Sequence, residues 1–282
     1  MKRALLLLMV LMAACSVAAE DFIASAVSGL ASDDPAARRA AFDAAVRLGA
    51  PMVAPLLDMI QRGGAAEKHT AEMALARVVA NASAPGAEEA AKVRDGLLGR
   101  LETGKDNAAA DRVCAARLLG IIGQADRRTA DALKKAALTG GPVSAASLEA
   151  MQRIPGRPMT DALTEALRRA DAAQRAAIVL ALGARKDLSV LPVLINLARG
   201  ASGDVQAAGV RALGLLGSAK AIPVLSKVGM GAPDRLRQAV ADALIAIADA
   251  RGQDGKSHLE ALRAARELAV TDAQKTAVGA HQ

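Results

Sequence analysis

A pattern of two short helices recurs along the chain at an interval close to 31 residues. Around Leu213, apolar or small residues fall at the spacing of one helical face, Gly217 and Ser218 interrupt the helix, and the same spacing resumes from Ala221. From Ala45 onward, residues equivalent to Leu213 follow one another at separations of 34, 40, 32, 31, 31 and 31. These residues are Ala45, Val79, Leu119, Met151, Leu182, Leu213 and Leu244. A lone hairpin cannot bury its apolar face, so the repeat predicts a stack of about seven helical hairpins.

The second helix of each hairpin has its own landmarks. The Leu225 position recurs at Leu57, Leu133, Leu163 and Leu194. A proline stands two residues earlier in three repeats, at Pro55, Pro192 and Pro223. Because proline is tolerated in the first turn of a helix and not in its interior, it marks a helix start.

The composition favours helices throughout. Hydrophobic residues make up 52% of the chain, while aromatic residues make up only 1%. The apolar content is therefore mostly Ala, Leu, Val and Ile, with Ala the strongest helix former and aromatic strand formers nearly absent. We expect an all-α protein.

The repeated residues resemble a known family. The pattern is D-x-x-(A)-x-x-A-L-G-x-x-G, then a short loop and [IV]-P-x-L, and it is clearest at Asp204–Leu225 and Gln174–Leu194. It is similar to the short, roughly 30-residue HEAT-like repeats of bacterial scaffolds and of the phycobilin lyase group. The resemblance implies an α-α superhelix over residues 34–270, with second helices lining a concave face. It specifies the fold far more closely than the function.

Segments of different character flank the repeats. Residues 20–33 are expected to form an N-terminal capping helix, with Phe22, Ile23, Ala26, Val27 and Leu30 on one face. Asp34 and Pro35 then suit the N-cap and first position of the next helix. Residues 271–282 are polar and are expected to form a frayed C-terminal tail.

The first 19 residues have the composition of a secretory signal peptide. Lys2 and Arg3 precede an apolar run from Ala4 to Ala14, and small residues follow. Eleven apolar residues are too few for a membrane-spanning helix, which needs about 20. Cleavage after Ala19 would release a soluble periplasmic or extracellular protein. Alternatively, Leu11–Cys15 resembles a lipobox, which would make Cys15 the lipid-anchored first residue.

Residues that could carry catalysis or hold a metal are scarce. His69, His258 and His281 form no metal-ligand pair. Cys114 aligns with small residues on the packed face of a first helix, which favours a buried structural cysteine. Two glycine pairs lack the strand and lysine of phosphate loops and are expected at helix C-termini with positive φ: Gly120 with Gly123, and Gly214 with Gly217. We therefore expect no catalytic residue, metal site or cofactor.

Basic side chains near the ends of the second helices are the candidate binding residues. They are Arg62, Lys134, Lys135, Arg168, Arg169, Arg199 and Lys227, continued by Arg263 and Arg266. They are interpreted either as a stepped basic stripe that binds a ligand or as cations that offset helix dipoles with no ligand.

Taken together, these features predict a non-catalytic exported scaffold. Its partner would be a protein or an acidic component of the cell envelope, bound on the concave face. An alternative is a HEAT-like lyase-type enzyme or enzyme subunit. Nucleic-acid binding is disfavoured by the export signal and by the lack of aromatic side chains to stack on bases. Membrane contact is expected only through a lipid at Cys15.

Overall fold

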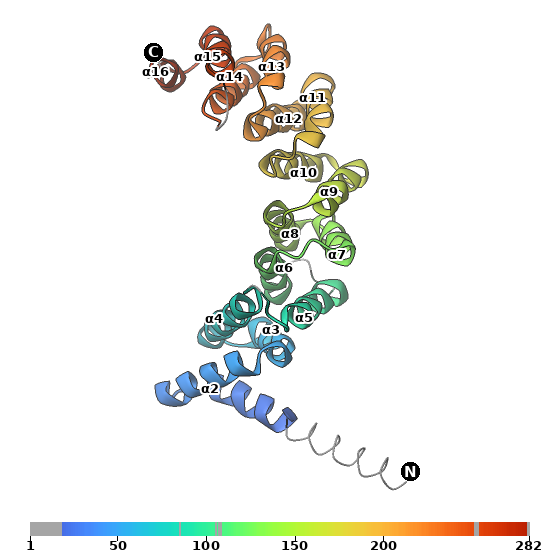
Figure 1. The fold of residues 1–282 in the computed structure, drawn as a ribbon, viewed down its shortest axis with the longest axis vertical. Helices are drawn as coiled ribbons and strands as arrows, with labels where there is room; N and C mark the ends of the chain where they lie inside the picture. Colours follow the sequence, from blue (N-terminus) through green and yellow to red (C-terminus); the bar gives the residue numbers. More distant parts are fainter. Residues whose placement is uncertain (1–18, 85, 105, 107–108, 251–253, 281–282) are drawn as a thin grey trace. The chain divides into compact units, whose positions relative to one another are not determined.

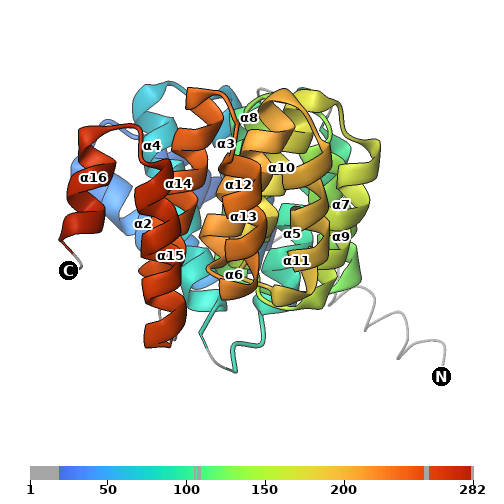
Figure 2. The same cartoon turned by 90° about the horizontal axis from the view of Figure 1, so that it is seen from above.

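The computed structural model describes residues 19–84, 86–104, 106, 109–250 and 254–280, and within these ranges it contains helices and no β-strand (Figures 1 and 2). Along the chain, fourteen helices of these ranges follow one another as seven successive pairs, each with a first and a second helix. The first helices are α2 (Pro35–Leu48), α4 (Ala65–Ala82), α6 (Ala110–Ile122), α8 (Gly141–Arg153), α10 (Ala172–Ala184), α12 (Gly203–Leu216) and α14 (Asp234–Ala248). The second helices are α3 (Val53–Arg62), α5 (Ala90–Thr103), α7 (Arg127–Ala137), α9 (Arg157–Arg169), α11 (Leu191–Gly200), α13 (Ile222–Gly229) and α15 (Gly255–Leu268). The expected all-α fold of the α-α superhelix class is confirmed.

The chain divides into two compact units. One comprises Met1–Gln124 with Gly141–Ala150, and the other comprises Ala125–Gly140 with Met151–Gln282. The predicted signal peptide, apart from Ala19, and the candidate lipidation residue Cys15 lie outside the described residues.

Helix starts follow the predicted chemistry. Asp34 caps α2, its carboxylate accepting hydrogen bonds from the backbone N–H of Ala36 at 3.0 Å and of Ala37 at 3.3 Å. Pro35 is the first residue of α2. Pro192 and Pro223 are the second residues of α11 and α13, each after a short 3₁₀ turn, η2 (Leu188–Val190) and η3 (Ala219–Ala221). The prolines therefore mark second-helix starts, as predicted.

Glycines let successive first helices approach closely. A Cβ on Gly183 of α10 would lie 2.6 Å from the Cα and the carbonyl oxygen of Ala212 of α12. Gly214 of α12 meets Ala243 of α14 in the same way, at 2.8 Å from its Cα. The Ala-Leu-Gly triplet of α12 thus packs its alanine against the glycine of the preceding triplet and its own glycine against Ala243, and only glycine fits at these two positions.

The glycine prediction is half right. Gly123 and Gly217 follow α6 and α12 in the left-handed region, each with φ of 70°, as expected. The prediction is wrong for Gly120 and Gly214, which lie inside their helices. Their role is close helix packing: a Cβ on Gly120 would lie 2.9 Å from the Cα of Ala150, within the first unit.

The N-terminal helix (residues 19–30) covers α2 with only part of its apolar content. Ala26 and Leu30 are buried, and a Cβ on Gly29 would lie 2.7 Å from the Cβ of Ala41 in α2. Phe22 differs from the expectation, because 68% of its surface is exposed.

The C-terminal segment forms a helix instead of fraying. α16 (Asp272–Gly279) begins at a capping box of Thr271 and Gln274. The buried amide of Gln274 donates hydrogen bonds to the carbonyl oxygen of Gln238 at 3.0 Å and to Asp242 Oδ1 at 2.6 Å, both in α14. The Gln274 side chain therefore fixes α16 to α14, and α16 covers the last hairpin like the first helix of an eighth repeat.

Among the described residues, no single helix has the length and hydropathy required to cross a membrane. Of the described helices, only α2 taken together with the segment Ala50–Arg62 would be long and apolar enough to span a membrane, and this pair is bent by 118°.

A candidate interaction surface on the second helices

Positive charge is concentrated on four second helices of the second unit. α7, α9, α11 and α13 together contain nine Lys and Arg residues against three Asp and Glu residues. In the same unit α10, α12 and α14 contain four against three. Figure 1 shows these four helices on one side of this unit, with α7 against α9 and α11 against α13. One side of the unit is thus basic and the other nearly neutral.

Two of the predicted cations are held in ion pairs. Lys134 Nζ lies 2.8 Å from both Asp131 Oδ1 in its own helix and Glu165 Oε2 in α9. Arg169 pairs with the other Glu165 oxygen at 3.1 Å. Hydrogen bonds from Lys134 lower the pKa of Glu165, and hydrogen bonds to Asp131 and Glu165 raise the pKa of Lys134. This network joins α7 to α9 and leaves Lys134 and Arg169 less available to a ligand.

Four other predicted cations face solvent. Lys135, Arg168, Arg199 and Lys227 are exposed, and none of them makes a hydrogen bond or ion pair with the described residues. Arg168 and Arg199 occupy the same position of successive repeats, and Lys135 and Lys227 share another. We call these four residues the basic surface. Each lies in the last turn of its helix, where its positive charge also offsets the helix dipole.

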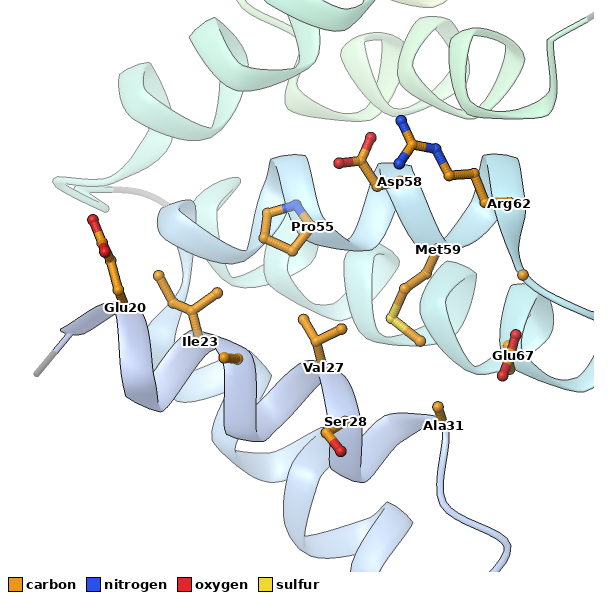
Figure 3. A pocket seen from close by; sticks show the side chains of 12 residues that line it. Glu20, Ile23, Val27, Ser28, Ala31, Pro55, Asp58, Met59, Arg62 and Glu67 are labelled. Carbon is orange, nitrogen blue, oxygen red and sulfur yellow. The ribbon is translucent and has the colours of Figure 1, made fainter. Parts of the chain in front are cut away.

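The remaining predicted cations lie elsewhere. Arg263 and Arg266 are exposed on α15. Arg62 belongs to the other unit, in the last turn of α3, and is a lining residue of a groove of 640 Å³ between α3 and the N-terminal helix. In the close view of this groove, Arg62 and Asp58 point away from the N-terminal helix (Figure 3).

The surroundings of Cys114 favour the protonated form of its thiol. Cys114 in α6 is largely buried, and burial, with a smaller contribution from Glu72, raises the pKa of its thiol to about 12. A thiol of that pKa is protonated at neutral pH and is a poor nucleophile. In the described part of the chain, no three His, Cys, Asp or Glu side chains gather in a way that could hold a metal ion.

An arginine clamp inside the second unit has a structural role that the sequence pattern did not indicate. Arg185, directly after α10, donates hydrogen bonds to the carbonyl oxygens of Met151, Ile154 (2.7 Å) and Gly156 (2.7 Å). Its Nε donates to Thr160 Oγ1 at 3.1 Å. The guanidinium therefore satisfies the carbonyls that end α8 and fixes the loop into α9. Burial lowers the pKa of Arg185.

Residues 160–245 match the family model of HEAT repeats. This segment consists of HEAT-like repeats. It runs from α9 to α14 and includes both Gly–Ala contacts of the second unit.

Several solved structures are similar to this chain at low sequence identity. The complex of CpcE and CpcF of phycocyanin lyase from Nostoc sp. PCC7120 matches at 20% identity and a TM-score of 0.38, over 86% of this chain and 93% of that chain. Kap95p bound to RanGDP matches at 14% identity and a TM-score of 0.45, over 90% of this chain and 46% of that chain. A designed armadillo repeat protein matches at 16% identity and a TM-score of 0.33, over 86% and 98%. No curated protein sequence matches.

Proposed function

We propose that this HEAT-like protein is a non-catalytic exported scaffold that binds another protein, or an acidic polymer of the cell envelope, through the basic surface. The observation that carries the proposal is the concentration of charge on α7, α9, α11 and α13, where four exposed cations have no acidic partner in the part of the chain that the structure describes. The opposite helices of the same unit lack this excess. Helix dipoles account for the position of each cation, while the difference between the two sides favours an acidic ligand.

The composition of the chain indicates how such a ligand would be held. Binding hot spots are usually Trp, Tyr and Arg, and the chain has neither Trp nor Tyr. Affinity would therefore depend mainly on the charges of arginine and lysine, and it should fall steeply with salt.

The proposal includes the absence of catalysis. A lyase-type activity, the alternative function, would need an activated group, and the protonated thiol of Cys114 gives it no support. Export rests on the pattern of residues 1–19 and is tested by N-terminal sequencing of the protein recovered from the envelope fraction. Replacing Cys15 with alanine separates the two forms of export, because only a lipoprotein would lose its membrane anchor.

The binding proposal is tested by charge reversal on the two sides of the same unit. The first variant changes Lys135, Arg168, Arg199 and Lys227 to Glu. The control variant changes the exposed first-helix residues Arg175, Arg211 and Arg235 to Glu. Binding of polyglutamate, and of proteins captured from the envelope fraction, is measured at low and high salt. We expect the first variant to abolish binding and the control to retain most of it. Equal losses in both variants, or binding indifferent to salt, would refute the proposal.

A further inference from the structure

The stack of second helices begins at α3, and one side of α3 borders a groove. α3 packs against α4, α5 and α6, so α5 covers it on the side of the following repeat. On its other side the N-terminal helix (residues 19–30) is packed against α2, the first helix of the hairpin. The groove of 640 Å³ therefore occupies the place that a preceding second helix would take.

The walls of the groove are apolar. Figure 3 shows Ile23 and Val27 of the N-terminal helix pointing towards Pro55 and Met59 of α3. All four side chains are only partly buried, which leaves apolar surface available to a ligand.

The two ends of the groove are acidic. Glu20 lies at one end and Glu67 at the other, whereas Asp58 and Arg62 on α3 point away from the N-terminal helix (Figure 3). Asp58 is already paired with Arg100, which also bonds Asp111 at 3.0 Å. The charged side chains at the two ends of the groove are therefore Glu20 and Glu67, and Glu67 Oε2 also accepts a hydrogen bond from the backbone N–H of Gly64 at 2.8 Å.

We propose that this groove binds an amphipathic helix of a partner protein, with an apolar stripe and a basic residue near each end. From Glu20 to Ala31 the N-terminal helix side of the groove is about 16 Å long at 1.5 Å per residue, which corresponds to about three helical turns. Apolar side chains at i, i+3 or i+4, and i+7 of the partner would contact Val27 and Met59. Lys or Arg near its ends would face the two glutamates. The groove is separate from the basic surface. It favours a partner with basic residues, whereas the basic surface favours an acidic ligand.

The probe for this site is a stapled helical peptide of about 15 residues, or four turns. It carries Leu at helical spacing and Lys near both ends, and a second peptide carries Glu in place of Lys. Binding to the full chain is measured by fluorescence anisotropy. We expect the Lys peptide to bind at least about threefold more tightly than the Glu peptide at low salt, the range of exposed ion pairs.

Two matched pairs of variants test the residues involved. Glu20→Lys should weaken the Lys peptide about three- to tenfold and strengthen the Glu peptide, while the neighbouring Asp21→Lys, with the same charge change in the same turn, should alter neither by more than about twofold. Val27→Ser should weaken both peptides, while Phe22→Ser, at an exposed residue outside this groove, should not. Unchanged circular dichroism in all four variants shows that the fold is intact.

Three results would overturn the proposal. The first is equal effects of Glu20→Lys and Asp21→Lys. The second is loss of peptide binding in the variant that reverses the basic surface, which would place the peptide on the other unit. The third is equal binding of the Lys and Glu peptides at low salt, which would leave the two glutamates without a role. Failure of polyglutamate binding would leave this proposal intact, because it concerns a different surface.

Discussion

Replacing Gly183 with alanine tests whether glycines set the spacing of the first helices. The new Cβ would lie 2.6 Å from the Cα and carbonyl oxygen of Ala212, whereas ordinary contacts of a Cβ begin at 3.4 Å. Since the obstructing atoms include the backbone of α12, a side-chain rotation cannot relieve the clash. α10 and α12 would have to separate by roughly 0.8 Å, which sacrifices a quarter to a half of the dispersion energy of the atoms in contact.

Two opposing effects determine the magnitude. Overpacking of this kind costs about 1 to 3 kcal/mol. Alanine in a helix is more favourable than glycine by about 1 kcal/mol, which offsets part of that cost. We expect a net loss of up to about 2 kcal/mol in the free energy of unfolding.

The control is Gly200→Ala at the end of α11 in the same unit. A Cβ on Gly200 would have no atom within 4 Å, so only the backbone benefit of roughly 0.4 to 1 kcal/mol remains, and stability should rise. Urea titration followed by circular dichroism gives the overall change, and amide hydrogen exchange in α10 and α12 gives the local change. A Gly183→Ala protein as stable as the Gly200→Ala control would refute this account of the interface.

Other expectations follow from single residues. Lys186 has φ of 56°, at the position where Gly123 and Gly217 stand in other repeats, so Lys186→Gly should raise stability by about 1 kcal/mol in thermal unfolding; a loss would contradict the strain. Cys114, with a thiol pKa of about 12, should react with iodoacetamide about a thousandfold more slowly than a small thiol at mildly alkaline pH until the protein is unfolded, and rapid labelling of the folded protein would exclude this. Gln274→Ala should remove hydrogen bonds worth about 1 to 3 kcal/mol and speed hydrogen exchange in α16 selectively; unchanged exchange there would show that Gln274 does not hold the helix. Hydrogen bonds from Ser189 lower the pKa of Asp187, so its stabilising contribution is complete above the unfolded value near 3.9 and is lost as pH falls through the lower folded value; Asp187→Asn should make stability less dependent on pH in that range, as acid titration would reveal.

Much of the architecture was predictable from local signals in the sequence. The recurrence of the Leu213 position, the prolines at 192 and 223, and the Asp34 cap each depend on residues within one or two turns. Such features can be recognised in a sequence because the backbone chemistry that requires them is also local. The hairpins and most helix starts were therefore predictable.

The unpredicted features depend on residues far apart in the chain. α16 looks polar and unstable by itself, but Gln274 finds its partners 36 and 32 residues earlier in α14. The sequence predicts Lys134 as a ligand-binding residue, but in the structure it is paired with Glu165, 31 residues later. A pattern locates a cation on a helix and gives no information on which acid the next helix supplies. The groove beside α3 likewise arises from how the N-terminal helix packs on α2, which its sequence alone does not specify.

The Ala-Leu-Gly contact also makes the length of the second unit adjustable in whole periods. Deleting the 31 residues from Leu182 to Ala212 would join Ala181 directly to Leu213 and restore an unbroken triplet. Gly214 would still pack against Ala243, so the shortened protein would need no new helix–helix contact. Duplicating the same stretch would add one repeat with the same geometry. The number of repeats can therefore change by duplication or deletion of a gene segment, while the contacts between neighbouring first helices stay the same.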